Sequence, residues 1–367
     1  MTKRIRRSPV DPIVQDRVRG CLLGGAVGDA LGAPVEFMRR SEIVARFGES
    51  GIRDYVPAYG RLGAITDDTQ MSLFTAEGML RGWVRFRLKG IGPVFANVTA
   101  YAYLRWLKTQ GYAPQPDAHV GEEGWLMGHK ELFSRRAPGT TCVSALRSLT
   151  RFKWRAANDS KGCGGVMRSA PVGIFLSRFG MADRTCVKET FQVASDIAAI
   201  THGHPTGYLA AGAHAVAVAS LLRGASLPEA LASAKNQLRL HKGHEETTLT
   251  IELAEQLARS EPNSPAAVQR IGQGWIAEEA LGISVYCALC AKDFEDGVVL
   301  SVNHDGDSDS TGAIAGNLLG CLHGASRIPK RWLEPLELRD VIEEIADDLA
   351  TAREWDVGRY STKYPPN

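Results

Sequence analysis

Residues 19–32 read RGCLLGGAVGDALG, with a glycine at every fourth position: Gly20, Gly24, Gly28 and Gly32. A spacing of four residues places these glycines on one face of a helix. Because a glycine inside a helix costs about 1 kcal/mol relative to alanine, a stripe of them requires a reason. The stripe predicts that another helix, or a ligand, approaches this backbone more closely than a Cβ atom would permit. Ordinary small-residue packing is the simpler explanation, and it too places the segment at the centre of the core.

A second stripe of the same kind lies near the other end of the chain. It has the sequence GAIAGNLLGCLHG, and its glycines are Gly312, Gly316, Gly320 and Gly324. The first stripe leads toward Glu36 and the second follows Asp309, and the carboxylates of both residues are candidate metal ligands. We therefore expect the two helices to lie close to a metal site.

The fold class follows from the spacing of apolar residues. They recur with helical spacing along most of the chain, and alternating segments typical of strands are hard to find. The sequence predicts an all-α protein with a single compact multi-helix domain over residues 16–352, a flexible basic arm at 1–15 and a tail at 353–367. The expected helices cover residues 14–33, 68–88, 92–109, 184–202, 206–223, 228–239, 244–259, 275–291, 310–325 and 337–351.

The composition is that of an ordinary globular protein, with 44% hydrophobic and 23% charged residues among 367. A formal net charge of +2 gives no reason to expect nucleic acid as a partner. Seven cysteines, an odd number, form no disulfide framework. No apolar segment follows the first basic residues, as a secretory signal would require. We therefore expect a cytoplasmic protein.

Two features invite other interpretations. Cys287 and Cys290 have the spacing of a zinc-binding pair, but they lie in a helical run without a second pair, so we assign them to the core. Residues 206–222 carry no Asp, Glu, Lys or Arg. That run is rich in alanine and glycine, has His214 at its centre and is shorter than the roughly 20 apolar residues of a membrane span. The sequence predicts a buried helix there and no membrane segment.

Acidic residues gather at two places that each precede an apolar helical run. Residues 66–69 read TDDT and residues 305–311 read DGDSDST. Residues of these types are common helix caps, because they accept hydrogen bonds from the first N–H groups and suit the positive end of the helix dipole. A cap needs only one such residue, however, and several adjacent carboxylates repel one another when no cation lies between them.

Divalent metal ions are therefore predicted at these helix starts. With Glu36 added, five of these carboxylates would hold two divalent ions near neutrality. A donor set made of carboxylate and hydroxyl oxygens favours Mg²⁺, or Mn²⁺, over zinc. The expected architecture is thus an all-α domain with a dinuclear metal centre at helix N-termini.

The chain resembles the ADP-ribosylglycohydrolases over roughly residues 16–325. The motifs that carry the resemblance occur in the family's order. They are RVRGCLLGGAVGDALGAPVEF at 17–37, GAITDDTQM at 63–71, GCGGVMRSAPVG at 162–173, ITHGHP at 200–205 and DGDSDSTGAIAGNLLG at 305–320. Any one of these motifs is a weak indication, but five in order are specific.

The resemblance implies a set of ligands for two Mg²⁺ ions, or Mn²⁺. These ligands are Thr66, Asp67 and Asp68 on one side and Asp307, Asp309 and Ser310 on the other. Glu36 would lie on a loop that closes over the metals in some members. Many members have threonine where Ser310 stands, and the retained hydroxyl preserves the ligand.

The resemblance also implies a substrate site. Gly162, Cys163, Gly164 and Gly165 would form a glycine-rich loop along ADP-ribose, and His202 would lie near its phosphates or ribose. Many members have asparagine where Cys163 stands, so the details of this loop are expected to differ.

The implied activity is hydrolysis of the glycosidic bond that joins ADP-ribose to a modified target. Two metal ions would orient the ribose and lower the pKa of a bound water, and Asp309, Asp307 or Glu36 would take its proton. The sequence does not decide the acceptor, the group to which ADP-ribose is attached. It would be an arginine, a serine or another side chain, a nucleic-acid end or a small conjugate. An ADP-ribosylated protein modified on arginine is the leading expectation.

Two alternatives keep the fold without making hydrolysis the primary function. Some bacterial relatives protect cells from ADP-ribosylating toxins. The basic arm upstream of Gln15 would then occlude the cleft of a transferase toxin, alone or together with reversal of its modification. The family also includes lens crystallins, which suggests a structural role, but the complete ligand set argues against a purely structural one.

Overall fold

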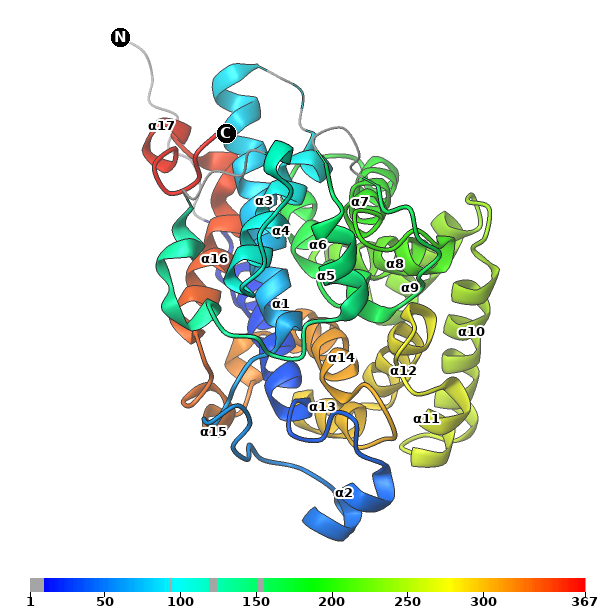
Figure 1. Cartoon of the computed structure of the whole chain (residues 1–367). Coiled ribbons are helices and arrows are strands. Elements are labelled where there is room, and N and C mark those ends of the chain that lie inside the picture. The colour runs from blue at the N-terminus through cyan, green and yellow to red at the C-terminus, as the bar shows by residue number, and fades with distance from the viewer. Residues whose placement is uncertain (1–9, 91, 93, 119–123, 151–154, 367) are drawn as a thin grey trace.

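The computed structural model describes residues 10–366 apart from 91, 93, 119–123 and 151–154, and these residues form a helical protein (Figure 1). Among the described residues, β-type backbone pairing is limited to two isolated bridges, Ala58 with Arg61 and Gly162 with Ile276. The prediction of an all-α, single-domain protein is confirmed.

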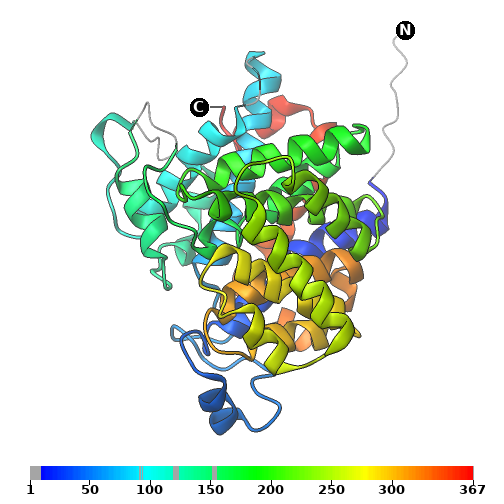
Figure 2. The same ribbon diagram turned by 90° about the vertical axis from the view of Figure 1, so that its right-hand side faces the viewer.

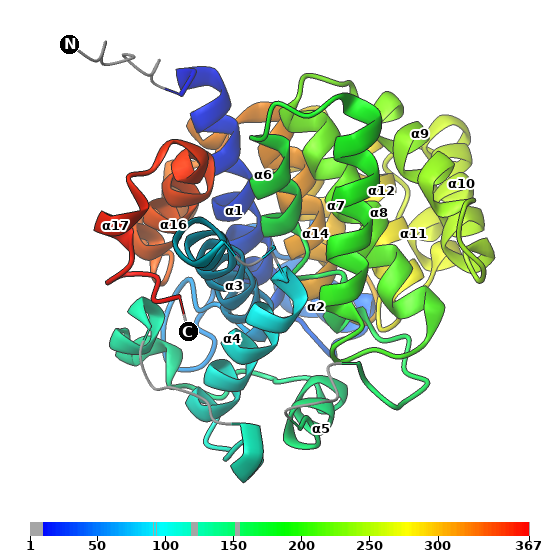
Figure 3. The same cartoon turned by 90° about the horizontal axis from the view of Figure 1, so that it is seen from above.

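Two antiparallel helices, α1 (Pro12–Gly32) and α14 (Ser308–His323), form the centre of the fold (Figure 3). α1 begins where Asp11 Oδ1 accepts a hydrogen bond from the N–H of Ile13 (2.8 Å), with Pro12 in the first turn. α14 begins after Asp307, whose Oδ1 accepts a hydrogen bond from the N–H of Ser310 (3.2 Å).

The glycine stripes of α1 and α14 face each other. A Cβ atom added to Gly28 would lie 1.9 Å from the carbonyl oxygen of Gly312. One added to Gly316 would lie 2.0 Å from the carbonyl oxygen of Gly24. The two backbones are therefore in direct contact, and the predicted close approach is confirmed.

The C-terminal end of α1 lies beside the N-terminal end of α14. A Cβ atom added to Gly32 would lie 2.3 Å from the carbonyl oxygen of Ser308. The chain therefore leaves α1 toward Glu36 next to the turn at which Asp307 and Asp309 begin α14. Packing of the glycines thus determines where these acidic residues lie.

Other helices cover the central pair on both sides (Figures 1 and 3). α16 packs against α1, whereas α12 and α13 pack against α14. On one side lie α3 (Asp67–Lys89), α4 (Phe95–Thr109) and α16 (Arg339–Thr351). On the other lie α6 (Ala170–Ser177), α7 (Asp183–Ala198), α8 (Pro205–Leu222), α9 (Leu227–Leu238), α10 (Glu245–Ser260), α11 (Pro265–Ile271), α12 (Ala277–Cys290) and α13 (Phe294–Val302).

Helix α2 (Arg40–Phe47) stands out from one end of the bundle in two perpendicular views (Figures 1 and 2). Ile43 is its buried residue. The loop that joins α1 to α2 contains Glu36 and Phe37, so this end of the molecule carries the candidate site.

All ten expected helices are present, with bounds within four residues of the predicted ones. The short helices α2, α5 (Thr140–Arg147), α6, α11, α13, α15 (Lys330–Leu333) and α17 (Val357–Tyr360) were not predicted. A helix of about two turns or less contains too few apolar positions to show a helical period. The helix α6 is buried on every side, so its sequence is apolar throughout and shows no apolar face. One glycine was assigned incorrectly: Gly324 caps the end of α14 with a φ of 82° and faces Asp16.

The remaining predictions concern α8 and the chain ends. α8 is long and apolar enough to cross a membrane, with a mean hydropathy of 1.2, and 89% of it is buried inside the protein. Residues 1–9 of the predicted arm lie outside the described residues, and α1 already begins at Pro12. In the predicted tail, Trp355 stacks on Tyr360, and the Tyr364 hydroxyl donates to Asp348 of α16 (2.6 Å).

Candidate functional site

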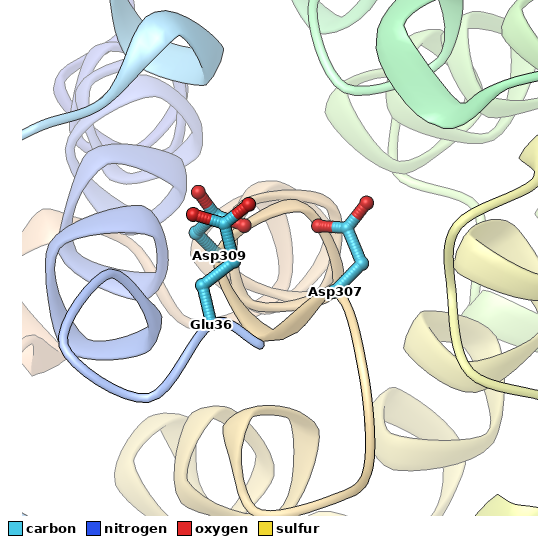
Figure 4. A group of neighbouring side chains, drawn as sticks. All are labelled: Glu36, Asp307 and Asp309. Carbon is cyan, nitrogen blue, oxygen red and sulfur yellow. The ribbon is translucent and has the colours of Figure 1, made fainter. Parts of the chain in front are cut away.

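Three carboxylates come together where α1 ends and α14 begins (Figure 4). One oxygen atom from each of Glu36, Asp307 and Asp309 lies within 4.8 Å of the others. Glu36 lies in the loop after α1, Asp307 is the N-cap of α14, and Asp309 lies in its first turn. The end of one helix and the start of the other thus bring together residues far apart in the sequence.

The start of α3 supplies two more carboxylates to the same cavity. Thr66 caps this helix by accepting a hydrogen bond from the N–H of Asp68 (3.3 Å), which leaves Asp67 and Asp68 in the first turn. Asp67 Oδ2 accepts a hydrogen bond from the N–H of Gly139 (3.2 Å). Asp68 Oδ1 is buried and has no hydrogen-bond partner among the described residues. A buried carboxylate oxygen without a donor is suited to a cation.

The carboxylates raise one another's pKa values. Burial raises the pKa of Asp67, Asp68 and Asp307 well above the usual range of an aspartate, and the nearby Asp309 raises it further in each case. The pKa of Glu36 is raised in the same way, first by burial and then by the charge of Asp309. The repulsion expected from the sequence is therefore present in the structure.

The donor set fits hard divalent cations. The oxygen donors that line the cavity here are the carboxylates and the hydroxyl of Ser310, and the thiol of Cys163 lies beside them. Glu36 Oε2 and Asp68 Oδ1 are buried without a hydrogen-bond partner among the described residues. Oxygen ligands of this kind, at the N-termini of two helices, suit Mg²⁺ or Mn²⁺.

Asp29, in the last turn of α1, belongs to this acidic group, although it was not among the predicted residues. Its carboxylate is fully buried and accepts hydrogen bonds from the N–H groups of Thr66 (3.0 Å) and Thr69 (3.1 Å). Asp29 therefore holds the first turn of α3 against α1. Burial, followed by the charge of Asp309, raises its pKa to about 7. A signal existed, since Asp29 is the single charged residue between Arg19 and Glu36.

A cavity of about 450 Å³ extends from these carboxylates. The predicted substrate residues Gly162, Cys163, Gly164 and His202 line it. Residues 137–142, which lead into α5, and the side chain of Arg135 line it as well, and these were not predicted. The cavity thus joins an acidic region to a region that offers backbone N–H groups and a cationic side chain.

Two predicted residues lie behind the cavity wall. Thr66 is buried, and its hydroxyl accepts the hydrogen bond that caps α3. Gly165 is buried under the glycine-rich loop, where an added Cβ would lie 2.8 Å from the carbonyl oxygen of Gly207. Neither is among the lining residues.

The glycine-rich loop is held from outside the cavity. Lys161 Nζ forms ion pairs with Glu246 (2.8 Å) and Glu278 (2.6 Å). The N–H of Cys163 donates to the carbonyl oxygen of Trp275 (3.1 Å). On its inner side, Cys163 Sγ donates to Asp307 Oδ2 (2.8 Å), which links the loop directly to the carboxylates.

His202 is neutral at the base of the cavity. Burial, together with the positive charge of Arg168, lowers its pKa to about 3. Its Nδ1 lies 2.8 Å from Thr201 Oγ1, and the same hydroxyl accepts a hydrogen bond from Arg168 (2.6 Å). Arg168 is fully buried and does not line the cavity, so it supports the site from behind.

We expect the metal-free protein to lose stability as the pH rises from about 4 to about 7, and Mg²⁺ to reverse this loss. An aspartate with a raised pKa binds its proton more tightly in the folded protein than in the unfolded chain, where its pKa is about 3.9. This contribution is complete below the unfolded pKa and is lost as the pH passes the folded pKa, which for Asp29 is about 7.

The measurement is thermal unfolding, in chelator and in Mg²⁺, on either side of the pKa of Asp29. Mg²⁺ should raise the unfolding temperature more at about pH 8 than at about pH 5, because protons and cations compete for the same carboxylates. Equal stabilisation by Mg²⁺ at the two pH values would contradict metal binding by these residues.

Comparisons with known proteins show which proteins this chain is similar to. A family model described as ADP-ribosylglycohydrolase matches residues 11–358. The chain is 27% identical to the ADP-ribosyl-[dinitrogen reductase] glycohydrolase of Rhodospirillum rubrum, over 89% of this chain and 92% of that protein. It is 25% identical to the ADP-ribosylarginine hydrolase Tri1 of Pseudomonas putida, over 91% of this chain and 78% of that protein.

A solved structure described as an ADP-ribosylglycohydrolase-related protein complex has the same fold. It matches with a TM-score of 0.66 and 26% identity, over 92% of this chain and 98% of that one. The family match begins just before α1, ends within α17 and includes all the residues that line the acidic cavity. This chain therefore belongs to the ADP-ribosylglycohydrolase family.

Proposed function

We propose that this protein is a metal-dependent hydrolase that removes ADP-ribose from a modified protein, with arginine as the modified side chain. The observation that carries the proposal is the convergence of carboxylates from α3, α14 and the α1–α2 loop in one cavity with the glycine-rich loop. The names of the relatives from Rhodospirillum rubrum and Pseudomonas putida support ADP-ribosylated protein as the substrate, and the second supports arginine.

Two Mg²⁺ ions, or Mn²⁺, are the proposed cofactors. The residues that would hold them are Asp67, Asp68, Asp307, Asp309, Ser310 and Glu36 of the cavity lining. Thr66 is the seventh predicted ligand, and its hydroxyl already caps α3. Once bound, the ions would supply Lewis-acid polarisation and lower the pKa of water. Five carboxylates line the cavity, so two divalent ions would bring their total charge close to neutrality.

The chain's own residues bind and orient the sugar phosphate. Gly162, Cys163 and Gly164 line the cavity and would contact the substrate. Gly164 packs against the protein, since an added Cβ there would lie 2.8 Å from Cys142 Sγ and 3.0 Å from the His202 ring. Arg135 and the backbone N–H groups at the start of α5 offer positive charge to a diphosphate. The neutral ring of His202 offers a hydrogen bond to a hydroxyl or phosphate oxygen.

One carboxylate takes the proton of the attacking water. Glu36, Asp307 and Asp309 are the candidates, because their oxygens lie within one small group. Glu36 differs from the other two in lying on a loop and in being half-buried, whereas both aspartates are buried in α14 and its cap. General base catalysis contributes about 10²- to 10⁴-fold, so substituting the true base should slow turnover by that factor.

The test is incubation of the purified protein with an arginine-linked ADP-ribosyl peptide in Mg²⁺, with detection of free ADP-ribose. We expect release in Mg²⁺ or Mn²⁺, none in saturating EDTA, and recovery when metal is restored, because the carboxylates require cations to share the cavity. A serine-linked peptide in parallel identifies the acceptor. Undiminished release in EDTA would exclude metal dependence, and release from the serine-linked peptide alone would exclude arginine.

The immunity alternative depends on the basic N-terminal arm. Its residues 1–9 lie outside the described residues, so occlusion of a transferase toxin stays a prediction from the sequence.

A further inference from the structure

Two aromatic side chains stack on each other at the edge of the cavity. The rings of Phe37 and Trp275 have centroids 5.3 Å apart and planes inclined by 21°. Both residues line the cavity. Phe37 is 69% exposed and Trp275 is 36% exposed, so burial in the core does not explain the pair. Exposed aromatic rings next to a cavity indicate a binding surface.

The backbone holds both rings in place. The carbonyl oxygen of Trp275 accepts a hydrogen bond from Cys163 of the glycine-rich loop (3.1 Å), and the adjacent Ile276 bridges to Gly162. Phe37 has a φ of 69°, a left-handed conformation that is rare for an aromatic residue. Backbone strain at an exposed ring is typical of a residue retained for function rather than for packing.

The charge beside the pair selects the kind of ligand. Phe37 follows Glu36 directly, and the cavity that both rings line contains five carboxylates. These five carboxylates carry one more charge than two divalent ions would neutralise, and Arg135, the cation among the lining residues, is assigned to the diphosphate. A cation is therefore attracted, and the faces of Phe37 and Trp275 favour a cation further.

We propose that the Phe37–Trp275 pair is the surface on which the modified guanidinium of the substrate lies. The inference rests on the proposed arginine-linked hydrolysis and names the residues that select this acceptor. A guanidinium remains planar and charged after it is joined to ribose, and it stacks on aromatic rings. A serine acceptor is neutral and has no planar group to place there. These rings, rather than the metal ligands, then set the preference for arginine.

The kinetic test compares Trp275→Leu with Trp275→Phe, which keeps a ring. On an arginine-linked ADP-ribosyl substrate, Trp275→Leu should raise KM by about 2- to 30-fold, the range that corresponds to one cation–π contact. The value of kcat should change less, because the contact is present in the ground state and the transition state. Trp275→Phe should stay close to wild type. Thermal unfolding of both variants, and Phe37→Leu as a second ring deletion, separate this effect from a folding defect.

The matched control is free ADP-ribose, which has no acceptor, with its Kd measured by calorimetry. We expect Trp275→Leu to leave this Kd unchanged. Equal weakening for ADP-ribose and for the arginine-linked substrate would mean that the rings bind ADP-ribose, which overturns the inference. An unchanged KM in both Trp275→Leu and Phe37→Leu would overturn it as well.

Binding of agmatine tests the rings without hydrolysis. N-carbamoylputrescine is the matched analogue of agmatine, because a neutral urea replaces the guanidinium while the ammonium at the other end is kept. The protein loaded with Mg²⁺ and ADP-ribose should bind agmatine at least several-fold more tightly than this analogue, and Trp275→Leu should remove the difference. If the wild type prefers agmatine but hydrolyses no arginine-linked substrate, the proposed function fails, while binding of a guanidinium at the rings is confirmed. If the wild type hydrolyses the arginine-linked substrate but does not prefer agmatine, the inference about the rings fails and the proposed function stands.

Discussion

Replacing Gly316 by alanine should destabilise the protein by roughly 3 kcal/mol or more, although alanine is the better helix former by about 1 kcal/mol. An added Cβ would lie 2.0 Å from the carbonyl oxygen of Gly24 and 2.5 Å from its carbonyl carbon. Both are backbone atoms, so no side-chain rotation relieves the clash and α1 must move away from α14. Leucine at Gly316 or Gly28 should have a larger effect. The measurement is the free energy of unfolding in a denaturant titration.

Gly128→Ala is the matched control, because Gly128 is exposed and no atom lies within 4 Å of its Cβ position. We expect its free energy of unfolding to stay within about 0.5 kcal/mol of the wild type. A Gly316→Ala protein as stable as the wild type would contradict the close packing of α1 on α14. Partly folded Gly316→Ala protein should also lose activity, since separating the helices separates Glu36 from Asp309.

The pairing of α1 with α14 was predictable from the sequence, but its register was not. Both stripes repeat every four residues, so a slip by about one helical turn would still set glycine against glycine. Polar contacts that no spacing rule predicts fix the register. Asn317 Nδ2 donates to the carbonyl oxygen of Cys21 (2.8 Å), and the N–H of Ser326 donates to Asp16 Oδ1 (3.0 Å).

The candidate site also has residues that the sequence predicts and residues that it does not. The acidic runs beginning at Thr66 and Asp305 were recognisable because their chemistry lies in consecutive residues before a helix. Asp29, Phe37 and Trp275 are single residues whose importance depends on tertiary contacts. Phe37 meets Trp275 only because the α1–α2 loop and the loop before α12 reach the same cavity. Periodicity and capping rules describe one segment at a time, so they do not reveal such a meeting.

Replacing Asp309 by alanine should abolish release of ADP-ribose while making the metal-free protein more stable. The charge of Asp309 contributes to the raised pKa of each of the other buried carboxylates in the group. Removing it relieves that repulsion, so the unfolding temperature in chelator should rise. Loss of a metal ligand costs several kcal/mol of transition-state stabilisation, and about 1.4 kcal/mol corresponds to a factor of ten. We therefore expect activity to fall by roughly 10³-fold or more.

Asp293→Ala separates this effect from the loss of an ordinary helix cap. Asp293 is exposed and caps α13 by accepting a hydrogen bond from the N–H of Asp296 (2.8 Å). Its removal should lower stability by about 1 kcal/mol and leave hydrolysis unchanged. Mg²⁺ should stabilise the wild type and Asp293→Ala by similar amounts, but Asp309→Ala much less, since a proposed ligand is missing. An Asp309→Ala protein that is less stable in chelator and equally stabilised by Mg²⁺ would show that Asp309 serves as a helix-start residue and not as a ligand.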